Sequence, residues 1–168
     1  MNVPNLLTWL RIIAIPLLVR LFYLPDPWVR PHDKNLYACV LFTAAAVTDW
    51  LDGYLARRLN QMSAFGAFLD PVADKLIVAA ALIILVELGR VPAYIAVIII
   101  GREITISALR EWMAKLGLAK SVAVNFLGKI KTVAQLVAIP MLLYHDPIGT
   151  WFDPAQIGTW PIYLAAAL

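Results

Sequence analysis

Four aspartates lie in two neighbouring apolar stretches of the sequence, where acidic side chains are expensive to bury. They are Asp49, Asp52, Asp70 and Asp74. In a helix that crosses a membrane, one such side chain costs about 2.5 to 3.5 kcal/mol on insertion scales. Asp49 and Asp52 are three residues apart and Asp70 and Asp74 are four apart, so each pair shares one helix face. A short polar connection separates the stretches, which predicts adjacent antiparallel helices that bring both pairs to a similar depth.

A cluster of four carboxylates has a formal charge of −4 and takes up protons unless cations are bound to it. Two divalent cations balance this charge. Ligation by oxygen alone suits Mg²⁺ or Mn²⁺, and no histidine or cysteine accompanies the aspartates to favour zinc. Paired metal ions are a known means of displacement at phosphorus. The aspartates therefore predict a two-metal site.

Two other interpretations of the aspartates stay open on spacing alone. In the first, they form structural ion pairs with Arg57, Arg58 and Lys75, in a protein that acts as a scaffold. In the second, they line the pathway of a divalent-cation transporter or channel. The transporter interpretation does not explain the small residues and the arginine that accompany the aspartates at fixed spacing.

The composition places these stretches in a membrane. Of 168 residues, 62% are hydrophobic and 15% are charged, with a mean hydropathy of +0.78. Soluble domains are closer to half apolar and a quarter charged, so lipid must cover part of this surface. The net charge of +3 is then explained by basic residues in cytoplasmic loops, and we expect no nucleic-acid partner.

Six apolar segments can be marked, and together they predict one all-α transmembrane catalytic domain over residues 1–168. They run approximately over 5–24, 36–55, 65–88, 91–116, 122–144 and 160–168. The last is too short to span a membrane by itself. We therefore expect a sixth helix that is truncated, or an oblique segment that starts at Trp151.

The distribution of Lys and Arg predicts that the N-terminus lies in the cytoplasm. If the connection between the second and third segments lies in the cytoplasm, most of the basic residues lie on the cytoplasmic side. These are Arg11, Arg57, Arg58, Arg102, Arg110, Lys115, Lys120, Lys129 and Lys131. The opposite side receives Arg20, Arg30, Lys34 and Arg90.

The aspartates belong to a longer motif. Its sequence is Asp49-Trp-Leu-Asp52-Gly53-Tyr-Leu-Ala56-Arg57, then eight residues, Gly66, three residues, Asp70, three residues and Asp74. Eight fixed residues over 26 positions resemble the motif of the CDP-alcohol phosphatidyltransferases at every defined position.

The flanks are similar to bacterial members of that family that use a glycerol phosphate acceptor. These flanks are 5–11, 102–112 and 121–132. One departure is Gly101, where the resemblance leads us to expect alanine.

The resemblance implies a six-transmembrane-helix bundle, usually a homodimer, in the bacterial cytoplasmic membrane with its active site facing the cytoplasm. It implies transfer of a phosphatidyl group from CDP-diacylglycerol to sn-glycerol 3-phosphate, with release of CMP. Asp49, Asp52 and Asp70 would bind one metal ion, and Asp49, Asp70 and Asp74 a second. Asp74 would also be the general base. Other acceptors within the same chemistry are inositol phosphate, serine and phosphatidylglycerol.

The CDP group is expected to contact small and polar residues around the motif. The resemblance assigns Gly53, Arg57, Ser63 and Gly66 to it, and Gly53 and Ala56 leave room for a nucleotide to approach a helix. Three polar residues interrupt the first apolar segment, and we expect them to face the nucleotide end of the cavity. They are Asn5, Thr8 and Arg11. Pro71 is expected either to start or to kink the third helix.

The phosphate of the acceptor requires a second cationic pocket. Arg102 and Arg110 are eight residues apart, which places them about 80° apart around a helix, so both can border one pocket. Lys129 and Lys131 are expected to complete it, arginine giving bidentate contacts and lysine a point charge. For Lys131, as for Lys115 and Lys120, contact with lipid headgroups is an alternative role.

Overall fold

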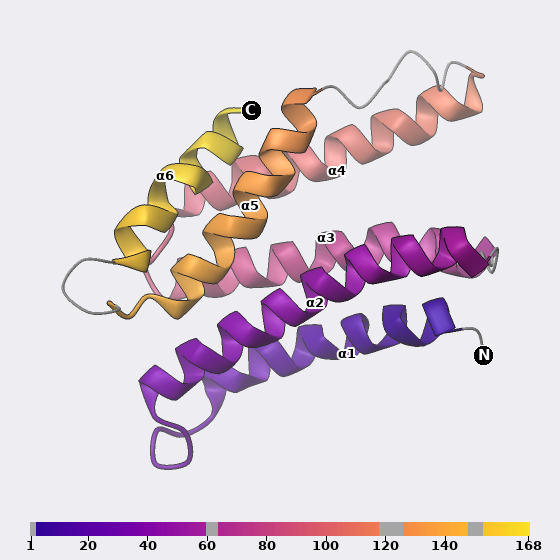
Figure 1. Cartoon of the computed structure of the whole chain (residues 1–168). Helices are drawn as coiled ribbons and strands as arrows, with labels where there is room; N and C mark the ends of the chain where they lie inside the picture. Colours follow the sequence, from indigo (N-terminus) through magenta and orange to yellow (C-terminus); the bar gives the residue numbers. More distant parts are fainter. Residues whose placement is uncertain (1–2, 60–63, 118–125, 148–152) are drawn as a thin grey trace.

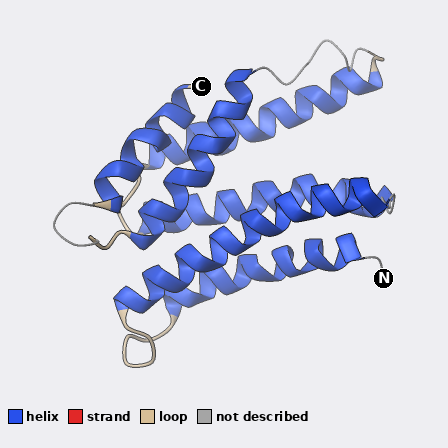
Figure 2. Cartoon of the chain, in the orientation of Figure 1, coloured by secondary structure: helices blue, strands red, loops and turns tan. Residues whose placement is uncertain are grey.

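The computed structural model describes residues 3–59, 64–117, 126–147 and 153–168, and these form six α-helices with no strand among them (Figure 2). The helices are α1 (Val3–Tyr23), α2 (Pro31–Leu59), α3 (Ala64–Glu87), α4 (Ala93–Lys115), α5 (Phe126–Tyr144) and α6 (Pro154–Ala167). The predicted all-α class and the six helices are confirmed.

The helices run back and forth between the two ends of an elongated bundle. The start of α1, the end of α2, the start of α3 and the end of α4 lie at one end (Figure 1). The connections α1–α2 and α3–α4, the end of α5 and the start of α6 lie at the other end (Figure 1). The predicted antiparallel course of α2 and α3 is therefore confirmed, and it brings the aspartate motif to a single end.

Helix α1 lies against both helices of the aspartate motif. Among the described residues its contacts with α2 and with α3 are each more extensive than the contact between α2 and α3. The sequence predicts direct packing of α2 on α3, but much of that contact is made through α1. Two buried residues of α1 contribute to these contacts. Arg11 has a partner on α2, and Thr8 has one on α3.

The core consists of aliphatic and small side chains from all six helices. Fully buried members include Leu18, Ala38, Leu82, Leu85, Ile99, Ile139, Leu142 and Ile162. The most extensive helix contact among the described residues is that of α5 with α6, where a Cβ on Gly158 would lie 3.1 Å from Leu142 Cγ and 3.3 Å from Ala138 O. Glycine therefore permits this close approach.

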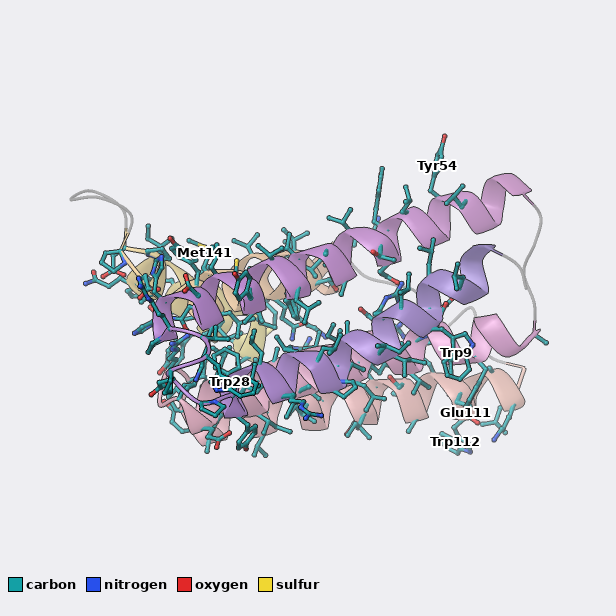
Figure 3. All side chains as sticks on the ribbon, turned by 90° about the horizontal axis from the view of Figure 1, so that it is seen from below. Trp9, Trp28, Tyr54, Glu111, Trp112 and Met141 are labelled. Atoms are coloured by element: carbon teal, nitrogen blue, oxygen red, sulfur yellow. The ribbon has the colours of Figure 1, made fainter. Side chains whose placement is uncertain are left out.

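Large apolar side chains also cover the outside of the bundle. Trp28, Val97, Phe68 and Trp160 are more than 60% exposed, and many leucines and isoleucines are exposed with them. A soluble monomer rarely shows so much contiguous apolar surface. Figure 3 shows Trp28 near one end and Trp112 near the other, positions at which tryptophan meets both membrane interfaces.

One described helix passes a simple test for a membrane span by length and composition. It is α1, through Leu6–Tyr23, with a mean hydropathy of 1.8. Helix α3 has Asp70, Asp74 and Lys75 in its first half, and three charged residues make a helix less apolar than a membrane span by this test. The prediction of six spanning helices is thus supported only in part, since one described helix passes this test.

The starts of α2 and α6 differ from those predicted, and Pro71 takes one of its two predicted places. Helix α2 begins at Pro31, since Lys34 in its first turn donates to Leu24 O at 2.6 Å and pairs with Asp26 at 2.8 Å. Helix α3 begins before Pro71, so this proline lies inside the helix and does not start it. Helix α6 begins at Pro154, capped by the Asp153 side chain, which accepts from Ala155 N at 3.0 Å.

A polar cluster joins the helices at the end opposite the aspartates. Arg90 Nη1 donates to Leu143 O at 2.8 Å and to Leu142 O at 3.1 Å, and Nη2 donates to Asn35 Oδ1 at 2.7 Å. Asn35 Nδ2 in turn donates to Asp146 Oδ2 at 3.1 Å. Burial lowers the pKa of the Arg90 guanidinium, while nearby Asp146 favours its charged form. This cluster ties the α3–α4 turn to α2 and α5.

Candidate active site

A buried arginine of α1 reaches the first aspartate of the motif. Arg11 Nη1 lies 2.9 Å from Asp49 Oδ1, and the Arg11 side chain is only 1% exposed. The Asp49 side chain is 46% exposed, so one carboxylate oxygen is held from inside the bundle while the group still faces outward. Burying arginine is favourable only with an anionic partner, which α2 supplies here.

The same face of α1 reaches the third aspartate. Thr8, three residues before Arg11, is 1% exposed, and its hydroxyl donates to Asp70 Oδ1 on α3. Residues three apart share one helix face, so a single stripe of α1 positions a carboxylate on each of two other helices. The sequence predicts that Thr8 faces the nucleotide. The structure shows that its hydroxyl contacts a motif carboxylate.

Asp74 lies one turn beyond Asp70 on α3 and borders a small polar cavity. The cavity, of about 60 Å³, is also lined by Lys75, Glu103 and Thr132. It lies between α3, α4 and α5. The carboxylate predicted as the general base therefore faces space that a small substrate group can enter.

Several predicted site residues have side chains outside the described part of the structure. They are Asn5 on α1, Asp52, Gly53, Ala56 and Arg57 on α2, and Ser63 between α2 and α3. Gly66 is described, and it is buried near the start of α3. The assignment of these residues to metal or CDP stays a prediction.

The described carboxylates have the ligand atoms that a hard cation prefers, but they are not close enough together to surround one. Asp49, Asp70 and Asp74 offer oxygen donors, which Mg²⁺ and Mn²⁺ prefer. Among the described side chains no three acidic, histidine or cysteine groups are close enough together to hold a metal ion. The side chain of Asp52, the fourth predicted ligand, lies outside the described part of the structure. In this arrangement the positive charge beside Asp49 is the Arg11 guanidinium.

The four residues predicted to hold the acceptor phosphate have different surroundings. Arg102 Nη1 donates to Ala165 O on α6 at 3.2 Å. Lys131 is buried and forms an ion pair with Glu103, so α4 already supplies its counter-charge. Arg110 and Lys129 are exposed. The structure therefore places two of these cations in internal contacts and two at the surface.

One residue at the candidate site was missed in the sequence. Gln135 on α5 is 6% exposed and lines the cavity beside Asp74. A single glutamine in an apolar helix was the available signal.

Trp50 and Tyr54 stack with ring centroids 6.2 Å apart at an interplanar angle of 12°, and Tyr54 points away from the bundle (Figure 3). These rings face outward and do not pack in the interior.

Comparison with known proteins gives one consistent result. The family model described as CDP-alcohol phosphatidyltransferase matches residues 1–168. A protein of Escherichia coli (strain K12) named CDP-diacylglycerol–glycerol-3-phosphate 3-phosphatidyltransferase is 49% identical, covering 99% of this chain and 88% of its own. Proteins with the same name in Salmonella choleraesuis and Shigella flexneri are each 48% identical, covering 88% and 94% of their own lengths.

Proposed function

Because the chain belongs to the CDP-alcohol phosphatidyltransferase family, we propose that it transfers the phosphatidyl group of CDP-diacylglycerol to sn-glycerol 3-phosphate. The products are phosphatidylglycerophosphate and CMP, and the reaction serves phospholipid biosynthesis. The names of the relatives that align with nearly the whole chain support this acceptor.

The structural observation that carries the proposal is the contact of α1 with both carboxylate-bearing helices. Arg11 holds Asp49 of α2, and Thr8 holds Asp70 of α3. A displacement at phosphorus needs charged groups that are fixed before the substrate arrives. The buried Arg11 guanidinium and the buried Thr8 hydroxyl fix two carboxylates in this way at one end of the bundle.

Two divalent cations, Mg²⁺ or Mn²⁺, are the proposed cofactors. Asp49, Asp52 and Asp70 would hold one, and Asp49, Asp70 and Asp74 the other. When bound, such ions neutralise charge on the phosphoryl oxygens and on the departing CMP. The presence of all four motif aspartates in the sequence supports this assignment.

The reaction is a direct displacement at the β-phosphorus of CDP-diacylglycerol. A hydroxyl oxygen of glycerol 3-phosphate bonds to that phosphorus, and its proton passes to a carboxylate oxygen of Asp74. The bond from phosphorus to the CMP oxygen breaks, and CMP leaves with the electron pair. A carboxylate is a weak base near neutral pH, so Asp74 acts chiefly by its position.

The substrate contacts proposed here follow from the motif and its flanks. CDP-diacylglycerol would contact Asn5, Thr8, Gly53, Ala56, Arg57, Ser63 and Gly66. The acceptor phosphate would lie among Arg102, Arg110, Lys129 and Lys131. Arg110 and Lys129 are exposed and therefore accessible to an anion from the aqueous side. Thr8 would serve the site through Asp70 as well as by contact with substrate.

The proposed setting is the bacterial cytoplasmic membrane, which the chain crosses several times as a homodimer. The exposed apolar side chains and the candidate span in α1 support burial in lipid. The cytoplasmic side would be the bundle end that contains the aspartate motif, because Arg110 and Lys115 lie near that end of α4.

The test is release of CMP by the purified protein in mixed micelles of detergent and CDP-diacylglycerol with Mg²⁺ or Mn²⁺. Glycerol 3-phosphate, inositol phosphate, serine and phosphatidylglycerol are supplied one at a time. We expect CMP with glycerol 3-phosphate alone, and none after chelation with EDTA. Release with inositol phosphate but not glycerol 3-phosphate would refute the acceptor. Divalent-ion flux into proteoliposomes without a lipid product would favour a transporter.

A further inference from the structure

A buried amide at the wall of the cavity beside Asp74 lacks a hydrogen-bond acceptor. Gln135 on α5 is 6% exposed, and its Nε2 has no hydrogen-bond partner among the described residues. Buried polar groups in proteins are nearly always paired, and an unpaired donor destabilises the fold. No described side chain or backbone group supplies this acceptor, so the amide can donate to a molecule that binds in the cavity.

The cavity lies between the amide and the proposed base. Asp74 from α3, Glu103 from α4 and Gln135 from α5 all line it. The Glu103 carboxylate already pairs with Lys131, so its charge is balanced. Asp74, Lys75 and the Gln135 amide thus present polar groups to a molecule that binds in this cavity.

The size of the cavity restricts what can bind there. Its volume of about 60 Å³ exceeds the roughly 10 to 15 Å³ that one water-sized sphere needs, so only a small group can enter it. A cytidine ring is far too large for this space. A carbon of a small acceptor that bears a hydroxyl group is small enough to enter. Its oxygen can accept a hydrogen bond from an amide N–H.

We propose that Gln135 determines acceptor specificity by donating a hydrogen bond from Nε2 to the C2 hydroxyl oxygen of glycerol 3-phosphate. This inference rests on the proposed function. The C1 hydroxyl then lies toward Asp74, and Gln135 exchanges no proton during the reaction. A site built to hydrogen-bond a hydroxyl rejects an analogue that lacks it, because its own polar group is then left unpaired.

The experiment compares two acceptors in the purified, reconstituted enzyme with Mg²⁺ and CDP-diacylglycerol. The second acceptor, 3-hydroxypropyl phosphate, keeps the attacking hydroxyl and the phosphate but lacks the C2 hydroxyl. For the unaltered protein we expect kcat/KM to favour glycerol 3-phosphate by about 30-fold, the effect of leaving one buried amide donor unpaired. In Gln135→Met, a substitution of similar length, this preference is expected to fall below about 3-fold through loss with glycerol 3-phosphate alone.

Gln156→Leu is the matched control, because Gln156 is an exposed glutamine on α6 at the other end of the bundle. It is expected to keep the full preference. An unchanged KM for CDP-diacylglycerol in Gln135→Met verifies the fold, and Gln135→Leu provides a second variant if that protein is unstable.

A preference that survives in both Gln135 variants would overturn the inference, as would equal use of the two acceptors by the unaltered protein. In either case glycerol 3-phosphate is still consumed, so the proposed function stands. Absence of CMP release with glycerol 3-phosphate in the unaltered protein refutes the proposed function itself.

Discussion

Arg11 Nη1 lies 2.9 Å from Asp49 Oδ1, which joins the first helix to the first aspartate of the motif. The arginine is buried and the carboxylate is half-exposed, so the pair fixes one carboxylate oxygen from the interior. Three residues earlier, Thr8 does the same for Asp70. The first helix is therefore a support for the site as well as a candidate membrane span.

Arg11→Met is expected to lower kcat/KM by about 100-fold, because partners of metal-binding carboxylates typically contribute 10- to 100-fold. It also removes the guanidinium charge beside Asp49. Added Mn²⁺ is then expected to raise the thermal unfolding midpoint more in the variant than in the unaltered protein, since the ion replaces the missing charge. Thermal unfolding in detergent with EDTA or Mn²⁺ measures this difference. Equal stabilisation of both proteins would argue against a shared location for the arginine charge and the metal.

Thr8→Val keeps the shape of the side chain but removes the hydroxyl that donates to Asp70. We expect about a 10-fold loss of kcat/KM and weaker apparent Mn²⁺ affinity, because Asp70 loses its fixed orientation. Thr8→Ser retains the donor and serves as the matched control, with activity close to normal. Steady-state kinetics at several Mn²⁺ concentrations separates the two effects. Similar losses in the two variants would assign the role of Thr8 to packing.

Asp74→Asn is expected to assemble normally and to lose activity by at least about 10³-fold, since general-base catalysis contributes roughly 10² to 10⁴. The amide is similar in size to the carboxylate, and Asp74 lies at a cavity wall with no described hydrogen bond to lose. Single-turnover CMP release measures the loss, and gel filtration in detergent verifies assembly. Near-normal turnover would remove Asp74 as the base.

Arg90→Leu is expected to reduce stability without affecting catalysis at low temperature. Arg90 donates to two backbone carbonyls and to Asn35, at the bundle end opposite the aspartates. Loss of these three bonds should lower the free energy of unfolding by about 2 to 4 kcal/mol, because a hydrogen bond contributes roughly 0.5 to 1.5 kcal/mol net. Denaturant unfolding in detergent and activity at low temperature are compared. An activity loss without destabilisation would place Arg90 in the catalytic machinery.

The sequence contains enough information to predict the class of fold and the course of its helices. The helix ends of α1, α3 and α4 lie within about two residues of the predicted bounds, because Pro and Gly mark them strongly. The start of α2 was predicted too late. Its polar first turn resembles a loop in composition, but the contact of Lys34 with Leu24 O satisfies that turn within a helix.

The site was predictable in residue type but not in its internal contacts. Spacing within a helix shows which aspartates share a face, but it says nothing about a third helix from elsewhere in the chain. The pairing of Arg11 with Asp49 spans 38 positions, and that of Thr8 with Asp70 spans 62. The signal available was the presence of buried polar groups in an apolar helix, which require partners without identifying them.

The most direct test of the account is the location of Mn²⁺ in crystals soaked with a CDP-lipid. The account predicts two anomalous peaks, both in contact with Asp49 and Asp70, with Asp52 completing one site and Asp74 the other. The diphosphate of the lipid should bridge these ions. Crystals that show the CDP-lipid bound without Mn²⁺, with Asp49 still on Arg11 and Asp70 on Thr8, would contradict the account.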